Sequence, residues 1–405
     1  MEYKPLSKLY YSNRNEYEEI FRSRYQSPEA VHLDFEVSKQ KCFFVQCDEV
    51  TRLMYEILRL DKSVALLSRS LPGKAITQYS RKCLIDEIVL TNNIEGVHSS
   101  RKEIGDALAI LEDQSDRKGK KNRFLGMVNR YYKFMSNEKV SIETCQDIRN
   151  IYDEIVLEEV IQEDKNNAPD GIIFRKDQAT VRSETDRELH AGITPEKSII
   201  EHMEKALRFL HDENVEPLYR YCLFHYLFEY IHPFYDGNGR TGRFILSYCI
   251  TGCLERLLAY RISETIKENM NAYYRAFKVC NDKKNKGDLT PFLIMTLKMI
   301  KESEEELEAS LRQKLDDWGR CETVILEMTK AESEKEQRLY SVLVQAALFS
   351  ELGIRRDELE KNLDISSVTL RKKLKAIDDR GLLETKKDGR YLFYMINTDR
   401  LNNDQ

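Results

Sequence analysis

The stretch that decides the fold reads His232-Pro-Phe-Tyr-Asp-Gly-Asn-Gly-Arg-Thr-Gly-Arg243. Its glycines satisfy G-x-G-x-x-G, a pattern that also marks dinucleotide-binding turns. Such a turn follows a buried parallel strand, whereas residues 219–231, YRYCLFHYLFEYI, have apolar positions at helical spacing. A Walker loop is excluded because no Gly-Lys-Ser/Thr closes the stretch. The sequence therefore predicts a helix, a tight loop and a second helix that begins near Thr241.

The loop has the parts of a phosphate-binding site. Gly237 and Gly239 allow successive backbone N–H groups to point into one concavity, and the following helix presents its positive end there. Arg240 and Arg243 add two permanent charges with planar donor groups, spaced i, i+3 on that helix. We expect both arginines to lean toward one polyphosphate.

Two further side chains in the stretch have chemistry to offer. His232 supplies a titratable nitrogen just before the loop, and the carboxylate of Asp236 is suited to hold Mg²⁺ against phosphates. Each residue also has a plain structural interpretation, with His232 as a core histidine, Asp236 as a helix cap and the arginines as a solvated face. The combination within twelve residues favours the functional interpretation.

The stretch fits His-x-Phe-x-Asp/Glu-Gly-Asn-Gly-Arg-x-x-Arg at each fixed position, and the sequence thereby resembles the Fic family of protein adenylyltransferases. The resemblance covers roughly residues 85–300 and includes Tyr273, Tyr274 and Gly287-Asp-Leu-Thr-Pro-Phe292. It implies transfer of AMP from ATP, with Mg²⁺, to a Ser, Thr or Tyr hydroxyl of a target protein, with release of pyrophosphate.

The family roles fall on residues of this stretch. The resemblance implies that His232 deprotonates the target hydroxyl, that Asp236 binds Mg²⁺ and that Phe234 anchors the loop in the core. A flap hairpin at about 172–192 would pair with the backbone of the target protein. The implied ATP contacts are Gly237, Asn238, Gly239, Arg240, Gly242 and Arg243, with Tyr273 and Tyr274 as candidates for the adenine.

A second family feature lies upstream, where Thr91-Asn-Asn-Ile-Glu95-Gly96 resembles the inhibitory helix pattern Ser/Thr-x-x-x-Glu-Gly/Asn. By resemblance, a helix at about 85–97 would bring Glu95 to Arg243, in the place of the γ-phosphate of ATP. We therefore expect autoinhibition by Glu95. Taken alone, the pattern also fits a helix C-terminus with Gly96 as its cap.

The composition predicts a mainly α-helical protein. Apolar residues make up 41% and charged residues 33% of the 405 residues, with only 8 Pro and 16 Gly. We expect a helical Fic core with a small β-hairpin flap, followed by a C-terminal winged helix-turn-helix domain. The expected parts are an N-terminal helical region at 1–80, the Fic core at 81–300 with its motif at 232–243, a connecting helix at 301–338 and the winged domain at 339–405.

The C-terminal part has a modest local excess of basic residues within 366–390. In a winged helix, residues 366–380 form the recognition helix and 386–390 form the wing tip, both suited to phosphate contacts. A winged helix used for dimer or protein contacts is the alternative. The candidate DNA contacts are Arg371, Lys372, Lys375, Lys387 and Arg390.

Charge and hydropathy restrict the remaining possibilities. The formal net charge is −5, so no global field draws the molecule to nucleic acid or an anionic membrane. We expect a cytoplasmic protein, because the sequence starts without a signal segment and has no run of 18 apolar residues. Two alternatives to AMP transfer stay open: a DNA-binding regulator with the Fic core as nucleotide sensor, and removal of AMP by the same site. A homodimer is compatible with either.

Overall fold

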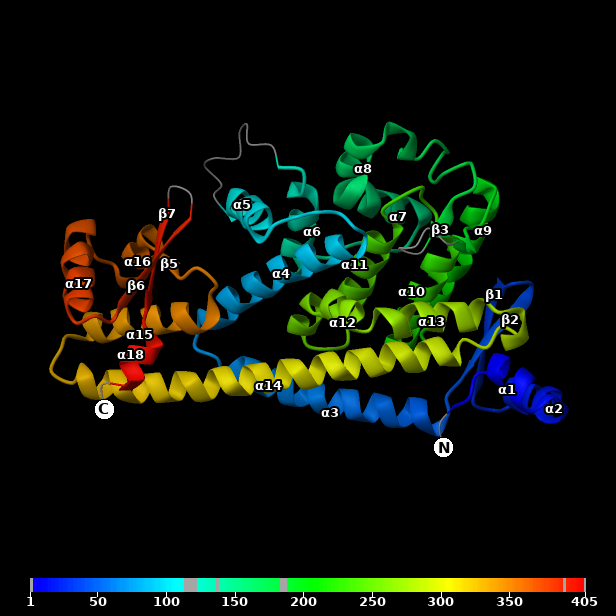
Figure 1. Ribbon diagram of the computed structural model, residues 1–405, viewed down its shortest axis with the longest axis horizontal. Coiled ribbons are helices and arrows are strands. Elements are labelled where there is room, and N and C mark those ends of the chain that lie inside the picture. The colour runs from blue at the N-terminus through cyan, green and yellow to red at the C-terminus, as the bar shows by residue number, and fades with distance from the viewer. Residues whose placement is uncertain (1–2, 113–121, 136–137, 183–187, 389–390, 404–405) are drawn as a thin grey trace. The chain divides into compact units, whose positions relative to one another are not determined.

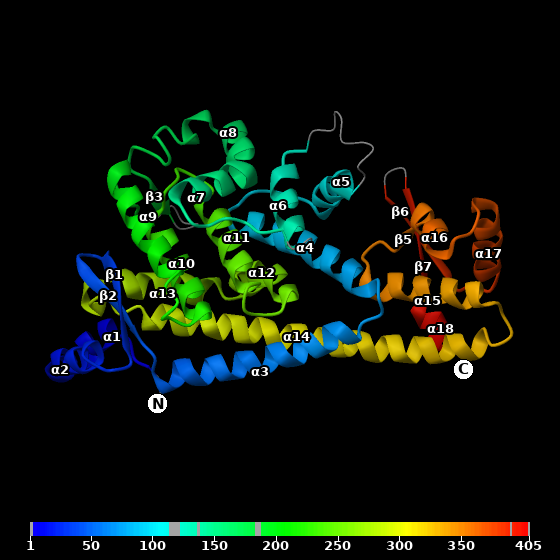
Figure 2. The same cartoon turned by 180° about the vertical axis from the view of Figure 1, so that it is seen from behind.

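The computed structural model describes residues 3–112, 122–135, 138–182, 188–388 and 391–403. It is predominantly helical with small antiparallel sheets, which confirms the predicted fold class (Figures 1 and 2). The chain divides into two compact units, Met1–Asp61 with Leu84–Glu305 and Lys62–Cys83 with Glu306–Gln405. The divisions fall inside three long helices, α3 (Asp48–Ser70), α4 (Ala75–Ile94) and α14 (Thr290–Met328).

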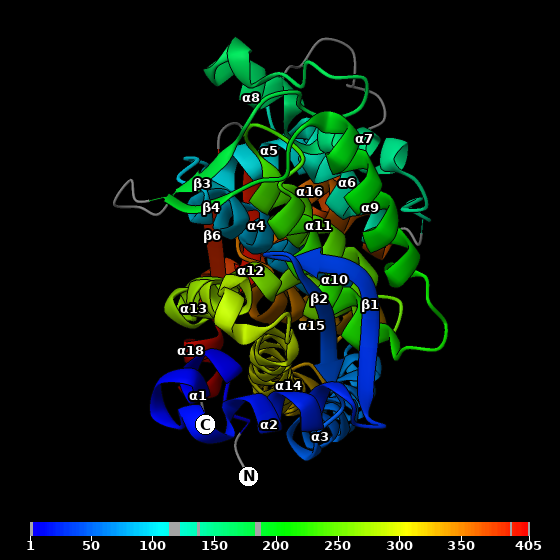
Figure 3. The same cartoon turned by 90° about the vertical axis from the view of Figure 1, so that its right-hand side faces the viewer.

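The first unit begins with α1 (Leu6–Ser12) and α2 (Arg14–Tyr25), and then departs from the sequence prediction. We expected only helices in the first hundred residues, but β1 (Ala30–Val37) and β2 (Gln40–Val45) form an antiparallel hairpin (Figure 3). Along β1, Leu33, Phe35 and Val37 are buried while the residues between them are exposed, which is the period of a half-buried strand.

The turn of this hairpin explains why the prediction was wrong. Ser38 and Lys39 both have positive φ angles, 51° and 65°. Two-residue hairpin turns with this geometry favour Asn-Gly or Asp-Gly, and Ser-Lys does not carry that signal.

The centre of the first unit is α10 (Pro217–Ile231), which packs against α9 (Glu196–Leu210) and α11 (Asn238–Ile250). Ten of the fifteen residues of α10 are buried, as expected for a helix in the middle of a core. The other elements of this unit are α5 (Arg101–Glu112), α6 (Leu125–Met135), α7 (Cys145–Tyr152), a π-helical turn (Asp153–Leu157), α8 (Glu158–Glu163), β3 (Thr180–Arg182), β4 (Glu188–Ala191), α12 (Ile262–Glu268) and α13 (Met270–Asn281).

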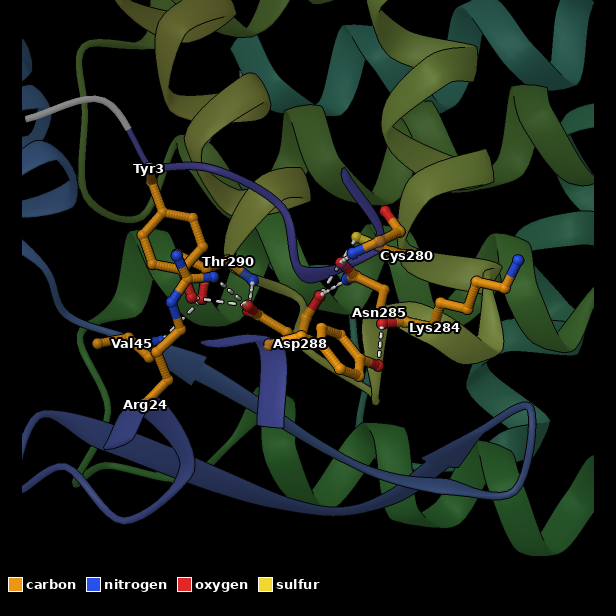
Figure 4. Close-up of polar contacts among 10 residues, drawn as sticks. Tyr3, Arg24, Val45, Cys280, Lys284, Asn285, Asp288 and Thr290 are labelled. Atoms are coloured by element: carbon orange, nitrogen blue, oxygen red, sulfur yellow. Dashed lines mark hydrogen bonds and ion pairs between the residues drawn. The ribbon is translucent and has the colours of Figure 1, made fainter. Parts of the chain in front are cut away.

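A buried carboxylate fastens the N-terminal segment to this core (Figure 4). Asp288 is fully buried, and its Oδ2 accepts a hydrogen bond of 2.6 Å from the Tyr3 hydroxyl and lies 3.5 Å from Nη1 of Arg24. Its Oδ1 accepts from the backbone N–H of Thr290 at 2.9 Å, at the start of α14. One side chain therefore ties three separate segments of the chain together.

The second unit contains α15 (Glu334–Phe349), α16 (Arg356–Leu363), α17 (Ser367–Asp379) and α18 (Thr398–Asn403) around a three-stranded sheet. The strands are β5 (Ile354–Arg355), β6 (Leu383–Asp388) and β7 (Tyr391–Ile396), in the order β5-β7-β6 with antiparallel neighbours. The unit has its own apolar core, which includes Leu343, Leu359, Leu370 and Ile396.

The expected connecting helix at 301–338 differs from the helices found there. α14 begins at Thr290 and ends at Met328, and α15 starts anew at Glu334. Among the described residues, no helix combines the length and the apolar character that a membrane crossing requires.

Candidate active site

The loop between α10 and α11 is closed by a single side chain. Nδ2 of Asn238 donates to the carbonyl oxygen of Phe234 at 2.8 Å, and its Oδ1 accepts from the N–H of Phe234 at 2.9 Å. Gly237, with φ of 77°, precedes the helix, which begins at Asn238 and not near Thr241 as predicted. Because both ends of its amide are engaged, Asn238 holds the loop in shape.

Phe234 lies at the bottom of this loop with no exposed surface. Its ring stacks on Tyr152 with centroids 3.6 Å apart and meets Phe174 edge-on at 5.6 Å. These contacts join the loop to α7 and to the segment before the flap hairpin.

His232 ends α10 in a left-handed conformation, with φ of 53°. Its Nδ1 is buried and has no hydrogen-bond partner among the described residues. Burial, followed by the positive charge of Arg175 and the neighbouring His190, lowers the pKa of His232 to about 3. The imidazole is therefore neutral at physiological pH, which is the state that a general base needs.

Arg175, which the sequence analysis did not single out, links the flap hairpin to His232. It is fully buried, its Nε donates to the carbonyl oxygen of His232 at 2.9 Å, and its Nη2 donates to that of Ile193 at 2.9 Å. On the far side of the hairpin, the N–H of Ile193 donates to the carbonyl oxygen of Ile231 at 3.0 Å. Both ends of the hairpin are therefore fastened next to the histidine.

The hairpin itself is shorter than the predicted 172–192. β3 and β4 form a two-stranded antiparallel sheet, which Figure 3 shows in green. A β-carbon on Gly192, at the end of the hairpin, would lie 2.9 Å from Cβ of His232, so only a glycine allows this approach.

The two arginines of the loop point to different partners. Arg240 is buried and its Nη1 forms an ion pair with Glu159 of α8, a residue that the sequence analysis missed. Nε and Nη2 of Arg240 have no hydrogen-bond partner among the described residues. A buried guanidinium with unbonded N–H groups is suited to bind an anion.

Arg243 is engaged on all three nitrogens by the end of α4. Its Nε donates to the hydroxyl of Thr91 at 2.8 Å, its Nη2 donates to the carbonyl oxygen of Thr91 at 3.0 Å, and its Nη1 lies 2.8 Å from Oε1 of Glu95. Burial lowers the pKa of Arg243, but the carboxylate of Glu95 and other nearby groups outweigh burial, and the pKa is raised. Arg240 and Arg243 thus each form an ion pair with a different glutamate, Glu159 and Glu95.

The local structure explains how Glu95 reaches this position. α4 ends at Ile94, and Gly96 adopts φ of 74°, so the alternative in which Gly96 is the helix cap also describes the geometry. A β-carbon on Gly239 would collide with Oε1 of Glu95, which shows that this carboxylate lies directly over the first turn of α11.

Three titratable side chains near Arg243, those of Glu229, Glu87 and His225, were not predicted from the sequence. Burial, followed by the negative charge of Glu95, raises the pKa of Glu229 to about 8, and burial raises that of Glu87 to about 7. Burial and the charge of Arg243 lower the pKa of His225 to about 3. A β-carbon on Gly242 would collide with Oε1 of Glu229, so the third glycine of the motif is needed for packing against this carboxyl group.

The candidate metal ligand lies in the loop, and the two candidate adenine contacts lie on α13. Oδ1 of Asp236 accepts a hydrogen bond from the N–H of Gly237 at 2.6 Å, and the residue is partly exposed. The Tyr273 ring is buried against Phe277, and its hydroxyl lies 2.7 Å from Nε2 of His225. Tyr274 is 38% exposed and is the more accessible of the two tyrosines for an adenine ring.

Comparison with known proteins links part of the chain to a family. Residues 143–250 match the model of the Fic/DOC family. The protein adenylyltransferase Fic of Drosophila yakuba is 30% identical over 95 residues, which make up 24% of this chain and 17% of that protein. The corresponding protein of Drosophila melanogaster has the same identity over 95 residues, 24% of this chain and 18% of the relative. The match thus spans less than a fifth of the length of these relatives.

A solved structure extends the likeness of the fold. A Fic family protein from Desulfovibrio desulfuricans G20 superposes with a TM-score of 0.51 and covers 87% of this chain and 97% of its own, at 20% sequence identity. At that identity the likeness concerns the fold alone. His232, the loop and the helices on either side of it lie within the segment of this chain that matches the model of the Fic/DOC family.

Proposed function

We propose that this protein is an adenylyltransferase that moves AMP from ATP to a Ser, Thr or Tyr hydroxyl of another protein. The observation that carries the proposal is the buried, unbonded Nδ1 of His232, within the described residues, at the start of the loop that leads into the N-terminus of α11 and its two arginines. The hydroxyl oxygen attacks the α-phosphorus and its proton passes to His232. The bond from the α-phosphorus to the bridging oxygen breaks, and pyrophosphate leaves.

The charges around the loop support this chemistry. Two buried nitrogens of Arg240 have no hydrogen-bond partner within the described part of the chain, and Arg243 offers a second guanidinium once Glu95 withdraws. Fixed donors of this kind stabilise negative charge as it moves to the leaving group. ATP is the substrate that brings several phosphates to such a site.

Asp236 fits a role in holding Mg²⁺. No group of three or more His, Cys, Asp or Glu side chains within the described residues is arranged to bind a metal, so a metal here would depend on the substrate. Mg²⁺ is commonly bound by one or two carboxylates together with phosphate oxygens, and it would supply neutralising charge to the triphosphate.

In this proposal, Glu95 keeps the site inhibited. Its carboxylate holds the guanidinium of Arg243 that a terminal phosphate would otherwise contact, and it repels that phosphate. The flap hairpin, fastened at Arg175 and Ile193, would receive the target as an added strand and bring its hydroxyl to His232.

The position of the label decides which group is transferred. The Glu95→Gly protein is incubated with ATP labelled at either the α- or the γ-phosphate, with Glu95→Gly/His232→Ala as the control. We expect that the α-label is retained on protein and that the γ-label is lost in pyrophosphate. The control variant, which lacks His232, should react at least about 10²-fold more slowly.

Each other outcome of this experiment points elsewhere. Retention of γ-label would mean phosphoryl transfer. If no label is retained, adenylyl transfer is refuted, and release of AMP from a previously adenylylated protein would then favour AMP removal by the same site.

A further inference from the structure

The second unit contains a helix-turn-helix followed by a hairpin. α16 ends at Leu363, Asp364 takes a left-handed conformation with φ of 49°, and α17 begins at Ser367. The guanidinium of Arg356, on α16, donates to the carbonyl oxygen of Ser367 at 3.2 Å and fixes the angle between the two helices. β6 and β7 follow α17, which is the order of elements in a winged helix (Figure 1).

The basic residues of this module fall into two classes. Lys373 lies 2.9 Å from Glu336 and Arg380 lies 3.3 Å from Glu332, so these cations support the fold. A second class is exposed and forms no ion pair within the described part of the chain. This class consists of Arg371, Lys372, Lys375 and Lys387.

Two of these unpaired cations line a hollow. Arg371 and Lys375, one turn apart on α17, border a pocket of about 300 Å³ whose opposite wall includes Thr385 and Tyr394 of the hairpin. A carboxylate, Asp378, lies at the end of the pocket nearest the C-terminus of α17. The cationic part thus has hydrogen-bond donors from both the helix and the strands, which suits a phosphate group.

The first turn of α17 carries a capping serine and an exposed apolar side chain. Ser366 caps the helix by accepting a hydrogen bond from the N–H of Thr369, and Val368, two residues after the cap, is 67% exposed. An exposed apolar residue on the same helix as exposed cations matches a DNA major groove, which offers thymine methyl groups between two rows of phosphates.

We propose that α17 binds the major groove of duplex DNA, with a backbone phosphate held between Arg371 and Lys375. Lys372 and Lys387 lie outside this pocket and would contact flanking phosphates. Arg390 is outside the described residues. The acidic net charge of the whole chain confines such binding to this module.

The test measures fluorescence anisotropy of a labelled duplex of about 25 base pairs with the full-length protein, at roughly 50–200 mM salt. We expect affinity to fall as salt rises. The Arg371→Ala/Lys375→Ala variant should bind about 10-fold or more weakly and lower the log–log salt slope by about 2. Lys373→Ala, on the same helix but paired with Glu336, is the matched control and should change the slope by less than about 1.

Three results would overturn the proposal. The first is wild-type protein that does not bind DNA at the lowest salt, and the second is a double variant that binds like wild type while its melting temperature is unchanged. The third is equal affinity for duplex RNA of the same sequence, because the A-form major groove is too narrow for a helix. Loss of a dimer in the double variant, seen by light scattering without any effect on DNA binding, would assign the surface to protein contacts instead.

Discussion

Oε1 of Glu95 lies 2.8 Å from Nη1 of Arg243, and the other two nitrogens of the same guanidinium donate to Thr91. All three donor nitrogens of Arg243 are thus taken by residues from the last turn of one helix and the residue just after it. The Glu95 side chain is 26% exposed, whereas that of Arg243 is 2% exposed. The carboxylate is therefore the partner that can withdraw, since it can return to water at a lower cost than the buried guanidinium.

Removing this carboxylate should strengthen ATP binding. Glu95→Gly frees Arg243 for a phosphate and removes a repelling charge, so we expect the dissociation constant for ATP to fall at least about 10-fold. Isothermal titration calorimetry measures it directly. Asn93→Gly is the control, because it introduces a glycine into the same exposed helix end without touching Arg243, and equal effects of both variants would contradict the inhibitory contact.

His232 should stay neutral well below the pH at which an exposed histidine takes up a proton. Burial and Arg175 lower its pKa to about 3, compared with about 6.5 for a model peptide. In side-chain NMR spectra, the imidazole signals that disappear in His232→Gln should not shift between about pH 5 and pH 8. A midpoint near pH 6.5 would show that the ring is solvated and that the neutral base is not built into the fold.

Local pattern was enough to predict the helix-loop-helix around His232 and the fold class, because both follow from residues close in sequence. The approach of Glu95 to Arg243 was expected only from the resemblance to a known family pattern. The hairpin of β1 and β2 was not predicted because Ser38 and Lys39 adopt positive φ angles, and neither serine nor lysine is a residue type typical of such angles.

Contacts between distant segments could not be predicted in the same way. Arg175, Glu159 and Glu229 acquire their roles only where buried segments meet, and a charged residue in a sequence usually lies at the surface. The same holds for the loop-closing hydrogen bonds between the Asn238 amide and the backbone of Phe234. Sequence alone indicates which chemical groups are present, whereas burial decides which of them keep free donors.

Glu229 should make the stability of the protein depend on pH. Its pKa is raised from the usual range near 4.5 to about 8, so between these values the folded state binds one more proton than the unfolded state. This contribution to stability is fully present below about pH 4.5 and is lost as the pH rises to about 8, at about 1.4 kcal/mol per pH unit.

Glu229→Gln removes this dependence, because glutamine does not titrate. In urea unfolding, the variant should gain stability relative to wild type between pH 5 and pH 8. Glu213→Gln, at an exposed position, is the control, and its difference in unfolding free energy from wild type should stay constant over this pH range. A pH-independent gap between Glu229→Gln and wild type would mean that Glu229 is ionised in the folded protein.

Substitution of Asp288 should lower the free energy of unfolding more than substitution of any one of its hydrogen-bond partners. Asp288→Ala leaves the Tyr3 hydroxyl, the Thr290 N–H and the Arg24 guanidinium without their acceptor, and we expect a loss of about 3–5 kcal/mol in urea unfolding. Tyr3→Phe removes one hydrogen bond and should cost about 1–2 kcal/mol. Tyr11→Phe, at a tyrosine that is 72% exposed, is the matched control and should stay within about 0.5 kcal/mol of wild type. Tyr3 and Arg24 belong to the N-terminal segment that Asp288 holds to the core, so Asp288→Ala should also speed proteolysis of the first 25 residues. An unchanged cleavage rate would show that α1 and α2 are held by their apolar contacts alone.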